Sequence, residues 1–235
     1  AVFVGDNPAS ASFLKQKERI AGELGVVFEL RRFEESVSEP ELISQIKKIA
    51  GDPAIGGMIV QLPLPKKFNQ NSIVSAINSK KDIDALTPQT PVLALPVEVV
   101  KDILTETRYN LTDKIVGIVG RGILIGKPVA EWLSGKCREV IIFHTKTDLI
   151  RIKDCDLVIL GAGKAGLIKP EMLKPGAGVI DFGFSVENGK IRGDFDADQV
   201  TNQQSNKLTF YTPTPGGTGP ILVAELFKNF YTLPR

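Results

Sequence analysis

The sequence IVGIVGRGILIGKP, residues 115–128, decides how the second half of this chain folds. Residues 115–119 have the composition of a buried strand, glycines follow at positions 120, 122 and 126, and Pro128 suits the first position of a helix. A strand, a glycine turn and a helix start present backbone N–H groups and the positive end of a helix dipole to a phosphate. The stretch therefore predicts a nucleotide-binding turn. Its third glycine comes one residue later than in G-x-G-x-x-G, and a tight structural turn is the alternative.

The strand expected next, residues 140–143, indicates which nucleotide fits this turn. NAD sites generally place an Asp or Glu about 20 residues after the glycine turn, where it binds the ribose 2′-hydroxyl. No acid stands there before Asp148, whereas Arg121 lies in the turn and can pair with a 2′-phosphate, so the sequence favours NADP over NAD. The candidate cofactor-binding residues are Gly120, Arg121, Gly122, Gly126, Lys127, Pro128, His144 and Thr145. His144 is the only histidine, and we assign it no catalytic role.

Apolar runs alternate with amphipathic segments along nearly the whole chain, which is typical of parallel strands joined by crossover helices. The sequence therefore predicts an α/β fold. We expect strands at residues 1–4, 27–33, 57–60, 115–119, 140–143, 157–160 and 179–182, and helices at 10–24, 39–50 and 128–133. Three prolines interrupt the alternation at residues 86–96, so we place a domain boundary there. One domain comprises residues 1–95 with 218–235, and the other comprises residues 96–217.

The stretch TPTPGGTGP, residues 212–220, carries three prolines and three glycines in nine residues. Such a loop is stiff and exposes its backbone, whereas a domain linker is usually polar and flexible. We therefore expect a surface that faces a ligand, with an ordinary linker as the alternative. An apolar helical pattern follows from Ile221.

The composition excludes several classes of function. The formal net charge is +2 and no basic run carries interleaved aromatic residues, so we expect no nucleic-acid partner. No apolar stretch has the length of a membrane span and the start does not resemble a signal peptide, so we expect a soluble intracellular protein with no membrane partner. Cys137 and Cys155 lack metal-ligand spacing, so we expect buried free thiols and no metal. The chain opens inside an apolar pattern without Met, and we expect the natural chain to begin earlier.

The helix expected over residues 10–24 has a lysine on its apolar stripe. The residues at i, i+3 and i+4 spacing are Ser10, Phe13, Lys17, Ile20, Ala21 and Leu24. Burial of Lys17 disfavours its charged form, which lowers the pKa of the amine and suits it to acid–base chemistry. A lysine that snorkels to water is the alternative.

Further polar residues stand where open α/β sheets place their ligands. The strand expected at residues 57–60 delivers Gln61 to its carboxyl end. Asp82 and Asp84 are two residues apart, so their side chains point the same way if the segment is extended. A carboxylate there can accept two N–H bonds from a flat amidine-like ring edge, and a turn or helix cap is the competing role.

Six motifs occur in an order that resembles one family. They are VGDNPAS at 4–10 followed by Lys17, QLPLP at 61–65, KDID at 81–84, the glycine turn to Pro128, KPG at 174–176 with VIDFG at 179–183, and PTPGGTGP at 213–220. Over nearly the whole chain these motifs resemble the methylenetetrahydrofolate dehydrogenase/cyclohydrolases of one-carbon metabolism. The resemblance implies a cytoplasmic two-domain enzyme, usually a homodimer, with folate in a cleft between an α/β catalytic domain and a Rossmann-like NAD(P)-binding domain.

The resemblance also implies roles for the candidate residues. Lys17 matches the catalytic lysine, Gln61 the glutamine that positions it, and Asp84 the aspartate that holds the pterin ring. The residues implied in binding the tetrahydrofolate substrate are Ser10, Phe13, Asp82, Pro215, Gly216 and Gly217. The implied reactions are NADP-dependent oxidation of 5,10-methylenetetrahydrofolate to the methenyl form and hydrolysis of that form to 10-formyltetrahydrofolate.

Several positions depart from the family pattern. Phe13 stands where tyrosine is usual, which retains an aromatic face and loses a hydroxyl. Ala85 replaces a glycine, Gly122 a serine and Ser185 an asparagine. Three alternatives therefore stay open: a monofunctional dehydrogenase without cyclohydrolase activity, a folate- or nucleotide-binding protein without turnover, and another two-domain NADP dehydrogenase acting on a small carbonyl compound.

Overall fold

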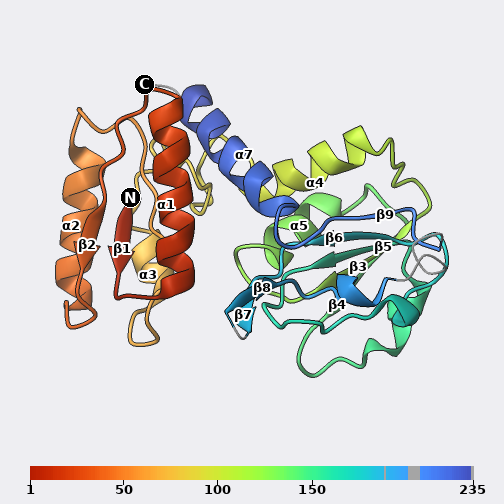
Figure 1. Ribbon diagram of the computed structural model, residues 1–235. Helices are drawn as coiled ribbons and strands as arrows, with labels where there is room; N and C mark the ends of the chain where they lie inside the picture. The colour runs from red at the N-terminus through yellow and green to blue at the C-terminus, as the bar shows by residue number, and fades with distance from the viewer. Residues whose placement is uncertain (188, 201–206, 234–235) are drawn as a thin grey trace. The chain divides into compact units, whose positions relative to one another are not determined.

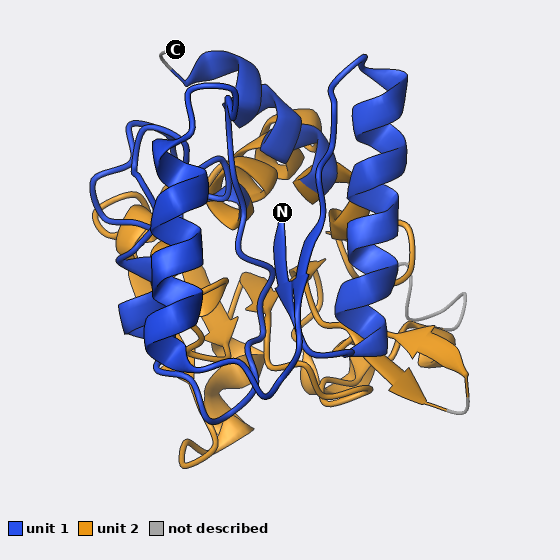
Figure 2. Cartoon of the chain, turned by 90° about the vertical axis from the view of Figure 1, so that its left-hand side faces the viewer, with its two compact units in different colours: residues 1–95, 223–235 blue, residues 96–222 orange. Residues whose placement is uncertain are grey.

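Parallel strands organise both parts of the chain (Figure 1). The computed structural model describes residues 1–187, 189–200 and 207–233. The chain divides into two units (Figure 2): unit 1 comprises residues 1–95 and the segment from Val223 onward, and unit 2 comprises Pro96–Leu222. The parallel strands alternate with helices along the chain, which confirms the α/β class predicted from the sequence.

Unit 1 is built on a small parallel sheet. Its strands are β1 (Val2–Val4) and β2 (Arg31–Phe33), and its helices within the first 95 residues are α1 (Pro8–Glu23), α2 (Glu39–Gly51) and α3 (Gln70–Val74). Val2 lies opposite Arg31 in the register and also forms a parallel bridge with Val60. The core combines residues of β1, α2, α3 and the segment near residue 60, among them Val2, Val4, Leu42, Ile46, Met58, Val60, Phe68 and Ile73.

Two strands expected in unit 1 differ from the prediction. The strand expected at residues 27–33 starts only at Arg31, and the side chain of Val27 is 88% exposed. Residues 57–60 form isolated bridges instead of a continuous strand. This segment bonds to two different neighbours, because Met58 N donates to Lys81 O whereas Ile59 O accepts from Val2 N. The apolar pattern therefore identified a buried segment without identifying its pairing.

Side-chain caps set where the helices of unit 1 begin. Asn7 Oδ1 accepts from the backbone N–H of Ser10 at 3.0 Å, and Pro8 occupies the first helical position, so α1 starts two residues before the predicted helix. Ser38 Oγ accepts from Glu41 N at 3.3 Å, and α2 covers the predicted residues 39–50. A cap of this kind stabilises a helix by roughly 1 kcal/mol.

Unit 2 contains a five-stranded parallel sheet in the order β4-β3-β5-β6-β9. The strands are β3 (Ile115–Val119), β4 (Glu139–Phe143), β5 (Leu157–Leu160), β6 (Gly178–Asp181) and β9 (Phe210–Tyr211), and β7 (Ser185–Glu187) and β8 (Lys190–Arg192) form a separate antiparallel pair. Helix α4 (Leu95–Glu106) precedes these strands, and helix α5 (Gly126–Leu133) connects β3 to β4. The short 3-10 segments Leu149–Asp154, Pro170–Met172 and Ala197–Gln199 lie between later strands. The predicted strands at 115–119 and 157–160 are confirmed, and those predicted at 140–143 and 179–182 begin one residue earlier.

The start of α5 corrects one expectation. This helix begins at Gly126, so Pro128 is its third residue and the prediction that it occupies the first is wrong. Pro128 still lies in the first turn, where backbone N–H groups have no partner within the helix. Its missing N–H therefore removes no helical hydrogen bond.

The last described helix, α7 (Thr218–Thr232), follows the loop of prolines and glycines. Its residues up to Leu222 belong to unit 2, and those from Val223 onward belong to unit 1. Val223, Leu226 and Phe227 are buried along the second part of this helix. The second part of the final helix therefore contributes buried apolar residues to unit 1.

Candidate active site

The buried stripe of α1 places Lys17 inside unit 1. The stripe consists of Ser10, Leu14, Lys17 and Ala21, and the lysine is only 3% exposed, so it does not snorkel to water. The predicted stripe was partly wrong. Leu14 had been missed, Phe13 and Ile20 are half-buried, and Leu24 is 47% exposed. Although α1 starts earlier than predicted, the same face of the helix packs inward. Fewer residues are buried on that face than the apolar pattern suggested.

The amine of Lys17 lies close to Gln61 and to the ring of Phe13 on unit 1. Its Nζ donates to Gln61 Oε1 at 3.1 Å and lies 4.8 Å from the centre of the Phe13 ring. Gln61 is 8% exposed, and its Nε2 donates to the carbonyl of Leu62 at 2.7 Å, which fixes the amide so that Oε1 faces the lysine. A residue of α1 and the residue that follows Val60 are therefore joined by a hydrogen bond at the Lys17 amine.

Burial shifts the acid–base properties of this group. Desolvation lowers the pKa of Lys17 below the usual lysine value, and the charge of Asp84 partly opposes that shift. Desolvation raises the pKa of the Asp84 carboxyl, and the charge of Lys17 opposes this shift in turn. Lys17 and Asp84 are thus electrostatically coupled, which brings together two of the residues that the sequence analysis selected.

Asp82 and Asp84 lie in different surroundings, because their segment forms a turn and is not extended. Asp82 is fully buried, and its Oδ2 accepts from the backbone N–H of Thr87 at 2.6 Å and from the Thr87 hydroxyl at 2.8 Å. Burial raises the pKa of the Asp82 carboxyl, and these hydrogen bonds oppose the shift. Asp82 Oδ1 has no hydrogen-bond partner in the described residues. Asp84 is half-buried and therefore the more accessible carboxylate.

The remaining predicted substrate residues are divided between the two units. Ser10 is 4% exposed and lies on the same stripe of α1 as Lys17, seven residues earlier. Pro215, Gly216 and Gly217 belong to unit 2, between β9 and α7. Thr218 Oγ1 donates to Asp181 O at 2.8 Å, so the end of β6 fixes this loop at the start of α7.

The glycine turn of unit 2 lies at the switch point of the sheet. β3 is flanked by β4 on one side and β5 on the other, and ligands of open α/β sheets bind at the carboxyl ends of such strands. Gly120 has φ 103°, and a Cβ on Gly126 would overlap the Gly120 carbonyl oxygen. Both positions therefore require glycine, and the chain winds closely enough to present the N-terminus of α5.

The other predicted cofactor residues surround this turn. Arg121, Gly122 and Lys127 are exposed, and Lys127 N donates to Gly122 O at 3.0 Å. His144 and Thr145 are exposed directly after β4, the strand next to β3, and His144 Nδ1 accepts from Lys146 N at 3.2 Å. A glycine cradle, a helix start and an exposed guanidinium are the donor set that a dinucleotide with a 2′-phosphate needs, so these residues fit NADP.

Sequence reasoning missed one residue beside this turn. Asp194 is fully buried, and its carboxylate accepts from the backbone N–H groups of Ala162, Gly163 and Lys164 at 2.6, 3.1 and 2.6 Å. It fixes the loop that follows β5 in the sheet. The only sequence signal was the pair of glycines at 161 and 163 after an apolar strand.

The structure also locates the two cysteines. Both are free, but only Cys155 is buried, so the expectation of burial is wrong for Cys137, which is half-buried. Within the described part of the chain, no group of three or more His, Cys, Asp and Glu side chains has the arrangement of a metal site.

Comparison with known proteins identifies relatives of both units. A family model for the tetrahydrofolate dehydrogenase/cyclohydrolase catalytic domain matches residues 1–84, and the model for the NAD(P)-binding domain of that family matches residues 94–234. The bifunctional protein FolD of Nautilia profundicola is 37% identical over 241 residues, which cover 97% of this chain and 83% of that protein.

Solved structures agree with these matches. The crystal structure of a bifunctional FolD from Campylobacter jejuni, a methylenetetrahydrofolate dehydrogenase/cyclohydrolase, aligns with a TM-score of 0.88 at 33% identity and covers 97% of this chain and 84% of that one. The corresponding enzyme of Trypanosoma brucei, in complex with NADP and an inhibitor, aligns with a TM-score of 0.89 at 27% identity and covers 99% of this chain and 84% of that one.

Proposed function

The chain belongs to the tetrahydrofolate dehydrogenase/cyclohydrolase family, and we propose that Lys17, Gln61 and Asp84 carry the chemistry of that family here. The protein is an NADP-dependent methylenetetrahydrofolate dehydrogenase and methenyltetrahydrofolate cyclohydrolase. We assign folate binding to residues 1–95 with 218–235, and NADP binding to residues 96–217. The observation that carries the residue assignment is the buried amine of Lys17, 3.1 Å from Gln61 Oε1 and coupled to Asp84.

For the oxidation, the residues of unit 1 act mainly by positioning. Asp84 accepts N–H bonds from the pterin ring edge, while the Phe13 ring offers a flat apolar face to the folate. Ser10 and the loop residues Pro215, Gly216 and Gly217 complete the proposed substrate contacts. Asp82, which is fully buried and bonded to Thr87, would support the turn without touching the substrate. Bound NADP supplies the acceptor for the hydride that leaves the methylene carbon. Gly120, Gly122, Gly126, Lys127, Pro128, His144 and Thr145 would hold it together with Arg121.

For the hydrolysis, Lys17 moves the protons. The oxygen of a water molecule bonds to the methenyl carbon while Lys17 Nζ takes one of its protons, which gives a neutral carbinolamine. Lys17 then donates that proton to N5 as the carbon–N5 bond breaks, the hydroxyl releases its proton, and the 10-formyl group remains. Gln61 keeps the amine in place through Oε1. Because Phe13 has no hydroxyl, its contact with the lysine is limited to the ring face.

An absorbance assay with the purified chain tests this function. We expect reduction of NADP in the presence of 5,10-methylenetetrahydrofolate, and hydrolysis of added methenyltetrahydrofolate faster than in buffer alone. Reduction without accelerated hydrolysis would identify a monofunctional dehydrogenase, and binding of both ligands without either signal would identify a binding protein.

Replacing Arg121 with serine should reduce the preference for NADP. A guanidinium paired with a 2′-phosphate contributes about 1.5–3 kcal/mol, so the ratio of kcat/KM for NADP to that for NAD should fall by about 10- to 100-fold. Arg138→Ser is the matched control. Arg138 is also exposed on unit 2, but it precedes the amino end of β4, whereas the proposed cofactor residues follow the carboxyl ends of the strands. An unchanged ratio in Arg121→Ser would remove this residue from the cofactor site.

We further propose that the enzyme is a cytoplasmic homodimer, as the family resemblance implies. Sedimentation equilibrium should then give twice the chain mass of 25.5 kDa. None of the helices described in the structure is long and apolar enough to cross a membrane.

A further inference from the structure

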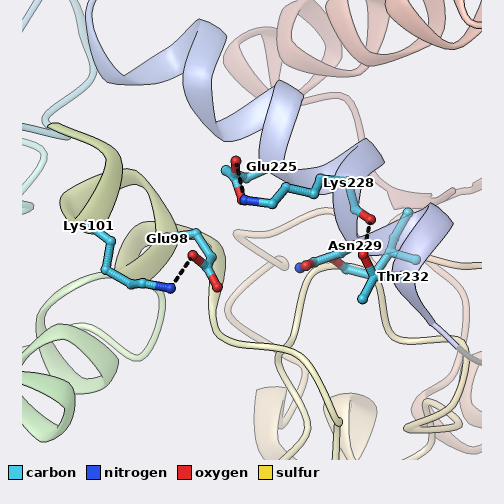
Figure 3. Close-up of polar contacts among 7 residues, drawn as sticks. Glu98, Lys101, Glu225, Lys228, Asn229 and Thr232 are labelled. Atoms are coloured by element: carbon cyan, nitrogen blue, oxygen red, sulfur yellow. Dashed lines mark hydrogen bonds and ion pairs between the residues drawn. The ribbon is translucent and has the colours of Figure 1, made fainter. Parts of the chain in front are cut away.

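Asn229 connects the last helix of the chain to the turn that contains Asp84. It lies near the end of α7 (Figure 3), its side chain is 5% exposed, and its Nδ2 donates to the backbone carbonyl of Ile83 at 3.1 Å. Donor and acceptor are 146 residues apart in sequence, and both belong to unit 1. The contact therefore fastens the carbonyl immediately before Asp84 to an element far along the chain.

Packing around this hydrogen bond leaves the turn little freedom. A Cβ on Gly57 would lie 2.7 Å from Ile83 Cγ2 and 2.8 Å from Phe230 Cδ2, so the Ile83 and Phe230 side chains both pack on the Gly57 backbone. On the other side of the turn, Asp82 Oδ2 holds Thr87 through two hydrogen bonds. Ile83 is thus fixed through its side chain by packing and through its carbonyl by Asn229.

We infer that Asn229 is a positioning residue for Asp84: its amide fixes the Ile83 carbonyl and thereby the direction in which the next side chain leaves the turn. A carboxylate that pairs with two N–H groups of a ring edge must be oriented closely, so the geometry of the turn before Asp84 decides whether it can do so. The inference rests on the proposed role of Asp84 in holding the pterin ring. It assigns to α7 a part in folate recognition through a residue that does not contact the reacting atoms.

Steady-state kinetics of residues 1–235, expressed as one chain, test this role. Asn229→Leu removes the donor at similar volume, and we expect KM for methylenetetrahydrofolate to rise about tenfold, the equivalent of one hydrogen bond, while KM for NADP stays within about twofold. Asn229→Ser serves as a second variant if leucine prevents folding. Thermal melts identify the variants that fold, and kinetics are measured well below their Tm.

Thr232→Val is the matched control. Thr232 lies three residues further along α7, is exposed, and its hydroxyl donates at 2.8 Å to the Lys228 carbonyl within the helix (Figure 3). Its replacement removes a hydrogen bond from the same helix without touching the turn, so KM for the folate should not change. An equal rise in Thr232→Val would show that general loosening of α7 causes the effect, and would overturn the inference.

A double variant separates this inference from the proposed function. If Asn229 acts through Asp84, Asp84→Asn combined with Asn229→Leu should bind folate no more weakly than Asp84→Asn alone. Full additivity, an unchanged KM in a folded Asn229 variant, or equal rises in both KM values would refute the positioning role while leaving Asp84 in place. Unchanged folate binding in Asp84→Asn alone would instead remove the role of Asp84, and the inference with it.

Discussion

Lys17→Met should lower the rate of methenyltetrahydrofolate hydrolysis by about 10²- to 10⁴-fold, the usual contribution of a general acid–base group. Methionine retains the apolar stem in the buried stripe of α1 and removes only the amine. The dehydrogenase should keep more of its activity, because oxidation needs positioning of the substrate more than proton transfer by this residue. The assay is loss of methenyl absorbance with the dehydrogenase measured in parallel.

The pH profile adds a readout that a folding defect would not produce. Burial lowers the pKa of Lys17, so its neutral form appears at a lower pH than for an ordinary lysine, whose pKa is about 10.4. In the unaltered enzyme, hydrolysis limited by this base should fall as the pH drops through that lowered pKa. Lys17→Met should lack this dependence.

A neighbouring lysine provides the control for this experiment. Lys15 is exposed on the same helix, and Lys15→Met should leave both activities and the pH profile unchanged. Undiminished hydrolysis in folded Lys17→Met would show that another group moves the protons.

Gly126→Ala should abolish most NADP binding. The added Cβ would overlap the Gly120 carbonyl oxygen, so the turn between β3 and α5 would have to open. Loss of two hydrogen bonds from this turn to a phosphate, at about 1.5 kcal/mol each, corresponds to about a hundredfold weaker binding. Calorimetric titration with NADP measures the change, and folate binding to unit 1 should be retained.

Gly22→Ala controls for the effect of any glycine replacement. Gly22 lies on α1, and its Cβ would meet no atom within 4 Å. The affinity of the Gly22→Ala variant for NADP should equal that of the unaltered chain. Normal NADP affinity in Gly126→Ala would mean that the nucleotide binds elsewhere on unit 2.

How far the sequence could predict the structure depended on what each segment packs against. Ile115–Val119 was predicted correctly because both faces of this strand are covered, so its apolar residues form one continuous run. Residues 27–33 gave a similar signal, but Val27 is 88% exposed and the strand is only three residues long. Apolar composition reports burial only when a partner surface exists, and the partner of a short edge segment cannot be read from local sequence.

The site shows the same limit for side chains. Helical spacing placed Lys17 on the inward face of α1 but left open whether its amine reaches water, and only the structure shows that the residue is 3% exposed. The different environments of Asp82 and Asp84 depended on the turn that contains them and on Thr87, and the i, i+2 spacing carries no information about either. Asn229 gave no local signal at all, since its acceptor lies 146 residues earlier.

The division of α7 between the units also sets an order of events during synthesis. Unit 2 is one continuous stretch, Pro96–Leu222, so all of its residues have left the ribosome before Val223 appears. Unit 1 contains the first residue, yet its Asp84 turn must wait for Asn229 and Phe230. Residues 1–95 are therefore synthesised before unit 2 but reach their final packing after it, because the Asp84 turn is completed only when Asn229 and Phe230 have left the ribosome.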